Sequence, residues 1–193
     1  MDQPVVAIAR AERGADASAV AAAVRRAVAL AGGLEDVVPA GGLALIKPNL
    51  VAPPPDPLCG ACTSAAVCQA LADLVIERGA RAVIAESSAR GLDTGVAMEI
   101  MGYTRLRAQG YDVVDLKRTP TVRVPVPGGR VLSDVVTFEL ALQADAILSV
   151  PVMKTHDQTD VSLSLKNLKG LVTDAEKRRI HQIGVFEGVA DLA

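Results

Sequence analysis

The sequence predicts an α/β fold, in which a mainly parallel sheet carries helices on both faces and a β-hairpin lies near residues 122–132. Three observations support this fold. Short apolar runs with the length of buried strands recur along the 193 residues. Segments with helical spacing of apolar residues separate most of these runs, as in units where a helix joins two parallel strands. Polar residues gather where several runs end, and the ligand crevice of such a sheet lies outside the carboxyl ends of its strands.

Five apolar runs are expected to form strands, with helices between most of them. The strands are expected at residues 5–9, 43–46, 82–85, 112–116 and 146–150. The helices are expected at residues 16–31, 63–78, 94–101 and 103–109. Pro48 closes the second strand because proline cannot donate a hydrogen bond to a sheet, and Gly102 separates the last two helices.

The segment after the fourth strand is less regular. Two short apolar stretches within residues 122–132 flank a Pro-Gly-Gly turn, which is typical of a β-hairpin at a sheet edge or in a flap. Residues 133–143 fit two structures, because Phe138, Leu140 and Leu142 alternate as in a strand whereas the last residues favour a helix. Both alternatives stay open at this point.

The composition sets bounds on size, location and partners. Half of the residues are hydrophobic, so we expect one α/β domain over residues 1–193. Aromatic residues make up 2% and the net charge is -2, which together disfavour stacking on nucleobases and binding to nucleic acid or an anionic membrane. The chain shows neither a run of apolar residues that would span a membrane nor a signal-peptide pattern, and we therefore expect a cytoplasmic protein.

A cationic cluster is the first candidate site. Lys47 follows one predicted strand, and Lys154 and His156 follow another, so all three are expected at the ligand-binding end of the sheet. Lysines would bind a carboxylate or phosphate, and a lysine with a lowered pKa or a neutral histidine would transfer a proton. These three residues are the candidate catalytic groups. The candidate substrate-binding residues are Asn49, Ser87, Ser88, Thr155, Lys166, Asn167, Lys169 and His181.

Some of these residues also have a purely structural interpretation. Lys166 and Lys169 would be the solvated face of a helix that buries leucines, and His181 follows a charged run that is typical of solvated helices. The favoured hypothesis is nevertheless an enzyme that transfers a proton next to the carboxylate of a small anionic metabolite, as an isomerase or lyase does.

A second candidate site uses the three cysteines. Cys59 and Cys62 form a C-x-x-C pair, and Cys68 is close enough in sequence to join them in a metal or iron-sulfur site of a redox protein. Cys68 also falls on the apolar stripe of a predicted helix, where a cysteine acts as a small hydrophobic residue. An odd number of cysteines does not form a complete disulfide framework, which agrees with a reducing compartment.

Several motifs in fixed order resemble a known family. They are Ile46-Lys-Pro-Asn-Leu50, Lys154-Thr-His156 and Ser164-Leu-Lys-Asn-Leu-Lys-Gly170, with shorter matches between and after them. This combination resembles domain of unknown function 362. The resemblance implies an α/β domain and, since members are often described as iron-sulfur proteins, an iron-sulfur site. It also implies that roughly the last third of the family domain lies beyond this sequence, so that an active site completed by that part would be incomplete here. A homo-oligomer or a completing partner chain is a separate expectation.

Overall fold

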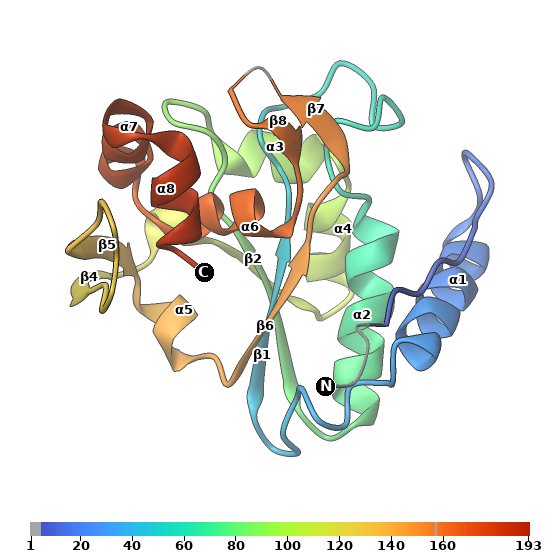
Figure 1. The fold of residues 1–193 in the computed structure, drawn as a ribbon. Coiled ribbons are helices and arrows are strands. Elements are labelled where there is room, and N and C mark those ends of the chain that lie inside the picture. The colour runs from blue at the N-terminus through green and yellow to red at the C-terminus, as the bar shows by residue number, and fades with distance from the viewer. Residues whose placement is uncertain (1–4, 157) are drawn as a thin grey trace.

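A computed structural model describes residues 5–156 and 158–193 of the chain. Its centre is a parallel four-stranded sheet in the order β3-β2-β1-β6, shown in Figure 1. The strands are β1 (Leu43–Pro48), β2 (Arg81–Glu86), β3 (Asp112–Asp115) and β6 (Ala146–Val150). Each neighbouring pair is parallel, so the carboxyl ends of all four strands lie at one end of the sheet. The predicted α/β class is confirmed.

Helices cover both faces of this sheet because successive side chains of a strand point to opposite faces. On β1, Ala44 and Ile46 pack into one apolar core and Leu45 into another. The first core includes side chains of α2 (Ala65–Glu77), α3 (Thr94–Ile100) and α4 (Tyr103–Ala108). The second includes side chains of α5 (Glu139–Gln143) and the 3₁₀ helices η1 (Leu116–Arg118) and η2 (Leu168–Leu171).

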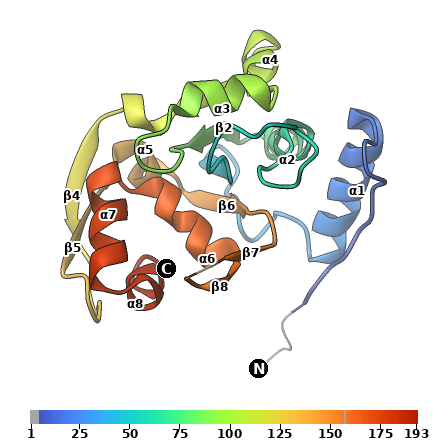
Figure 2. The same ribbon diagram turned by 90° about the horizontal axis from the view of Figure 1, so that it is seen from above.

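Helix α1 (Ala17–Leu30) packs against α2 on the side away from the sheet, as Figures 1 and 2 show. Asp16 caps it by accepting a hydrogen bond from the backbone N–H of Ala19 at 2.8 Å. None of its residues is fully buried, so this helix adds little to the cores that position the site.

The segment after β6 returns over the carboxyl end of the sheet. A two-stranded antiparallel hairpin forms from β7 (Lys154–His156) and β8 (Asp160–Ser162), and α6 (Ser164–Asn167) follows it directly. Helices α7 (Asp174–Ile183) and α8 (Val185–Ala190) then complete the described chain. Ile180 of α7 is fully buried in a third apolar core with Leu132 and Val135.

The prediction of a strand at residues 5–9 is wrong. These residues form no strand, and Val6 and Ile8 are more than four-fifths exposed. The sheet instead begins with β1, which lies between β2 and β6. A short apolar run predicts a strand only where a neighbouring strand offers a partner for its backbone, and this run has none.

The predicted hairpin exists, but its second strand lies later in the chain. Strand β4 (Thr121–Pro125) pairs with β5 (Asp134–Phe138), not with residues 130–132. The backbone N–H groups of Arg130, Val131 and Leu132 instead donate hydrogen bonds to the carboxylate of Asp191. Both interpretations of residues 133–143 are partly correct, because β5 is followed at once by α5.

Candidate functional site

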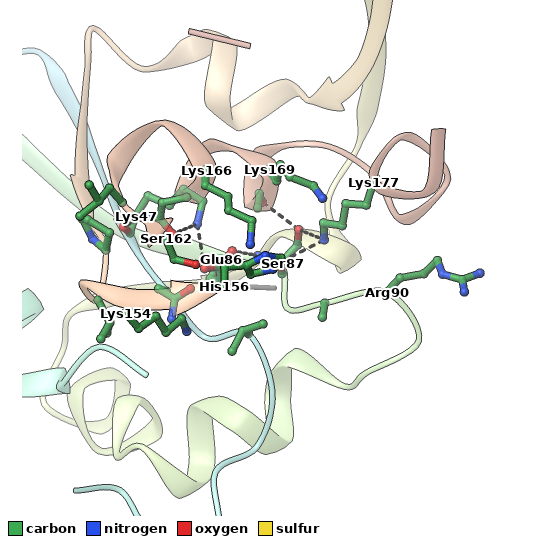
Figure 3. Close-up of a pocket in the computed structure, with 18 of the residues that line it drawn as sticks. Lys47, Glu86, Ser87, Arg90, Lys154, His156, Ser162, Lys166, Lys169 and Lys177 are labelled. Atoms are coloured by element: carbon green, nitrogen blue, oxygen red, sulfur yellow. Dashed lines mark hydrogen bonds and ion pairs between the residues drawn. The ribbon is translucent and has the colours of Figure 1, made fainter. Parts of the chain in front are cut away.

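A cavity of about 300 Å³ lies at the carboxyl ends of β1 and β2, as shown in Figure 3. Loops after β2 and β6, the β7–β8 hairpin, α6, η2 and α7 also contribute to its walls. Most of the charged side chains that line it are cationic. They are Lys47, Arg90, Lys154, Lys166, Lys169, Lys177 and Arg178, and Glu86 is the one acidic residue among the described lining residues.

Lys47 and Glu86 form a buried ion pair in the floor of the cavity. The ammonium nitrogen of Lys47 lies 2.8 Å from Glu86 Oε2, and it also donates to the carbonyl of Pro48 at 2.9 Å and to Asn167 Oδ1 at 3.0 Å. Burial lowers the pKa of Lys47, and the adjacent Glu86 carboxylate opposes this effect. All three ammonium protons of Lys47 therefore have acceptors within the protein.

Asn167 ties α6 to β1 and β6. Its Nδ2 group donates to the backbone carbonyl of Lys47 at 3.0 Å and to Ser149 Oγ at 3.1 Å. Gly170 follows Asn167 in the sequence and packs against the same ion pair, because a Cβ atom there would lie 2.0 Å from Glu86 Oε1. The tight packing of η2 on the ion pair therefore requires glycine at this position.

Lys177 holds α7 against the end of β2. Its ammonium group donates to Ser87 Oγ at 2.7 Å and to the carbonyls of Ser87 and Ser88 at 3.0 and 2.8 Å. It also pairs with Asp174 at 3.2 Å. Burial is the main reason that the pKa of Lys177 falls to about 8, although Asp174 and Glu86 act in the opposite direction.

Lys154 extends toward the loop that carries the C-x-x-C pair. Its ammonium group donates to the carbonyl of Ala61 at 2.8 Å, and Asn49 Nδ2 donates to the same carbonyl at 2.8 Å. Thr63 fastens this loop to β6 because its hydroxyl donates to the carbonyl of Val150 at 2.7 Å. Burial lowers the pKa of Lys154, whereas Cys62 and Cys59 oppose this effect.

Two histidines also line the cavity. His156 Nδ1 accepts a hydrogen bond from the backbone N–H of Gln158 at 3.0 Å, an arrangement that leaves the proton of a neutral ring on Nε2. His181 Nε2 lies 2.6 Å from the ammonium nitrogen of Lys169. The pKa of Lys169 falls to about 8, first through burial and then through repulsion by Lys166 and Lys177.

Most of the residues singled out in the sequence meet at this cavity. Those that line it are Lys47, Asn49, Ser87, Lys154, His156, Lys166, Asn167, Lys169 and His181. Ser88 and Thr155 do not line it. Thr155 is exposed, and the hydroxyl of Ser88 donates to the carbonyl of Leu92 at 3.0 Å. The substrate-binding role predicted for these two side chains stays a prediction.

Sequence reasoning missed several lining residues. Lys177 and Arg178 belong to a charged run that is typical of a solvated helix, although only Arg178 is exposed. Glu86 directly follows the predicted strand at residues 82–85, and this position was the available signal. Arg90 lies further along the same loop, two residues after Ser88. Ser162 has no such signal in the sequence, because it enters the cavity through the β7–β8 hairpin.

The three cysteines do not form a cluster-binding site. Cys68 is fully buried on α2 and lies 3.4 Å from the hydroxyl of Tyr103, and burial raises the pKa of its thiol to about 12. The thiol of Cys62 is turned to the carbonyl of Ala52 at 3.2 Å, and Cys59 is exposed. Within residues 5–156 and 158–193, no three side chains of the kinds that bind metals are placed to hold an ion. These residues do not fit an iron-sulfur cluster.

Comparison with known proteins places the chain in a family. Residues 44–193 match the family described as a domain of unknown function (DUF362). The chain belongs to this family. It is also 30% identical over 174 residues to the thylakoid-associated protein sll1697 of Synechocystis sp.. That match covers 86% of this chain and 50% of the relative, so the chain spans about half the length of the curated relative it matches.

The comparison also bears on location. No helix in the described part of the DUF362 chain is long and apolar enough to cross a membrane. The Synechocystis relative carries the description thylakoid-associated, which is a statement about that protein. A cytoplasmic location for this chain stays a prediction.

Proposed function

We propose that this DUF362 protein is an enzyme that binds an anionic metabolite by its carboxylate in the cavity and transfers a proton next to that group. The charge of the residues that line the cavity supports this proposal. Seven lysine and arginine side chains and a single carboxylate line it in the described chain, although the whole protein has a net charge of -2. Positive charge is therefore concentrated at one site, where it would raise the local concentration of an anion.

Lys154 is the group best suited to proton transfer. Its ammonium group makes one hydrogen bond, to the carbonyl of Ala61, and has two further protons that face no described acceptor. Partial burial lowers its pKa, which brings its neutral form closer to physiological pH. Its protonated form would attract a carboxylate, and its neutral form would accept a proton from the adjacent carbon.

His156 supports the same chemistry from the neighbouring position on β7. In a neutral ring, the hydrogen bond that its Nδ1 atom accepts from Gln158 places the proton on Nε2. An Nε2–H group that faces the cavity would donate a hydrogen bond to a substrate oxygen on which charge develops during the reaction.

We assign Lys47 and Asn167 to positioning rather than to contact with the substrate. The polar atoms of both side chains form hydrogen bonds within the protein. Lys47 donates to three acceptors, and Asn167 donates to Lys47 and Ser149. Removal of either would disturb the floor of the cavity without removing a group that reacts.

The test is deuterium incorporation into carboxylates. A panel of small mono- and dicarboxylates is incubated with the full chain in D₂O, and exchange at the carbon next to the carboxylate is followed by NMR. We expect exchange of at least one compound, and a rate at least about 100-fold lower for Lys154→Ala, the usual contribution of a general base. Arg105→Ala is the matched control, because Arg105 is exposed on α4 and does not line the cavity. Exchange that is unchanged in Lys154→Ala would exclude the assigned role.

A further inference from the structure

The cavity carries more positive charge than one carboxylate neutralises. Glu86 is paired with Lys47 at 2.8 Å, and Asp174 is shared by Lys177 at 3.2 Å and Lys117 at 3.1 Å. For Lys154 and Lys169, no described carboxylate lies within ion-pair distance. A single carboxylate bound at Lys154 would therefore leave Lys169 without a counter-ion among the described residues.

The excess is centred on Lys169 of η2. Lys169 is held close enough to Lys166 and Lys177 for both to repel it, and it is partly removed from solvent. Such an arrangement costs free energy unless an anion binds beside it. In Figure 3, Lys166, Lys169 and Lys177 lie along one side of the cavity, Lys154 lies on the other, and His156 lies between them.

A neutral donor faces the same cavity without a partner. The hydroxyl oxygen of Ser162 is buried, and the residue is 7% exposed. Within the described part of the chain, this hydroxyl has no hydrogen-bond partner, although buried polar groups are nearly always paired. Ser162 ends β8, two positions before the start of α6, which carries Lys166. An acceptor oxygen from a ligand would satisfy it.

Building on the proposed function, we propose that the ligand also carries a doubly charged phosphate group, bound by Lys166, Lys169 and the hydroxyl of Ser162. Its carboxylate end would then lie at Lys154, and the substrate class would be a small phosphorylated carboxylic acid. Lys177 contributes charge but no direct contact, because Ser87, Ser88 and Asp174 accept all its ammonium protons.

Phosphate fits this position better than a second carboxylate for two reasons. A phosphate monoester carries about -1.5 to -2 charges at neutral pH, so it interacts with neighbouring lysines more strongly than a singly charged carboxylate does. Its three terminal oxygens point in different directions and accept from separate lysine and hydroxyl donors, whereas a carboxylate offers two oxygens in one plane. The donors here are lysines and a serine from β8, α6 and η2.

The test is binding of inorganic phosphate, measured by calorimetry and thermal stabilisation in a phosphate-free chloride buffer of constant ionic strength. Acetate and malonate are measured in parallel as carboxylate probes. We expect phosphate to bind more tightly than acetate, and its Kd to rise about tenfold or more in Lys169→Ala and in Ser162→Ala, since each loses a hydrogen bond to a charged group. Lys169→Arg should keep most of the affinity, and Arg105→Ala should keep all of it.

The outcomes separate this inference from the proposed function. If the carboxylates bind and phosphate stabilises the protein no more than chloride, the phosphate subsite is excluded while the proposed function stands. If phosphate binds with the same Kd in Lys169→Ala and Ser162→Ala as in the wild type, its site lies elsewhere and the inference is again excluded. If neither phosphate nor any carboxylate binds, both proposals fail. Circular dichroism of each variant verifies that it is folded.

Discussion

The ammonium nitrogen of Lys47 lies 2.8 Å from Glu86 Oε2, and neither side chain is more than 4% exposed. The pair joins the carboxyl ends of β1 and β2, and Asn167 of α6 completes it. Because Glu86 Oε1 also accepts the N–H of Ser87 at 2.7 Å, one buried carboxylate organises the backbone under the cavity. The floor of the candidate site is therefore held together by a buried ion pair and its hydrogen bonds rather than by apolar packing.

Lys47→Met should destabilise the protein by about 3–5 kcal/mol, because it leaves the Glu86 carboxylate buried without its cation. Urea unfolding measures the change. The double variant Lys47→Met, Glu86→Gln should recover part of the loss, since it buries no charge. Arg81→Met is the control, because the Arg81–Asp112 pair on the same sheet is exposed and should contribute less than about 1 kcal/mol. Equal losses at both pairs would contradict this account.

The sequence was sufficient to predict the four strands of the sheet and the end at which polar residues meet, although it also predicted a strand at residues 5–9 that does not form. Lys47 and Lys154 each follow a predicted strand, and parallel pairing brings such positions to the same end. The sequence did not predict which lysine ammonium groups form hydrogen bonds and ion pairs within the protein. Lys47 and Lys177 are both buried by contacts with residues far away in the sequence, and no local pattern encodes those contacts.

The same limit applies to the chain around the site. The hairpin partner of β4 was misplaced because Asp191, far along the chain, takes up the backbone donors of residues 130–132. The cysteines suggested a cluster because their spacing is visible in sequence, whereas the contact of Cys68 with Tyr103 in the core is not.

Gly170→Ala should destabilise the protein by about 1–3 kcal/mol, because the added methyl group would lie 2.0 Å from Glu86 Oε1 and 2.5 Å from Lys47 Nζ. Thermal unfolding measures the loss. Gly95→Ala is the matched control, since its methyl group would meet a single flexible Asp93 oxygen at 3.0 Å and alanine favours the helix. If Gly170→Ala is as stable as the control, η2 does not pack on the ion pair as described.

Lys169→Met should stabilise the unliganded protein at pH 7. The pKa of Lys169 is about 8 in the folded state, against 10.5 for an unperturbed lysine, so the folded state binds fewer protons between these values. Charged Lys169 therefore costs stability in full below pH 8, and the cost disappears as pH rises to about 10.5. Solvent screening limits the gain from Lys169→Met to less than about 1 kcal/mol.

Urea unfolding of Lys169→Met at about pH 7, 9 and 10.5 in a phosphate-free buffer checks this prediction, since these values span the two pKa values of Lys169. The difference from the wild type should shrink with increasing pH. Arg105→Met should show no such trend, because Arg105 is exposed and lies outside the cavity. A Lys169→Met variant that is less stable than the wild type at pH 7 would mean that the contact with His181 outweighs the repulsion.

One thiol per folded chain should react quickly with a chromogenic aromatic disulfide at pH 8, and that thiol should be Cys59. Cys59 is exposed, whereas burial protects Cys62 and Cys68 and raises the pKa of both thiols. Cys59→Ser should abolish the fast phase, Cys68→Ser should leave it unchanged, and urea should expose all three thiols of the wild type. Two fast thiols in the native protein would mean that the loop opens enough to release Cys62 from the carbonyl of Ala52. Lys154 and Asn49 donate to the carbonyl of Ala61 in the same loop, so both would then be held less firmly than the structure implies.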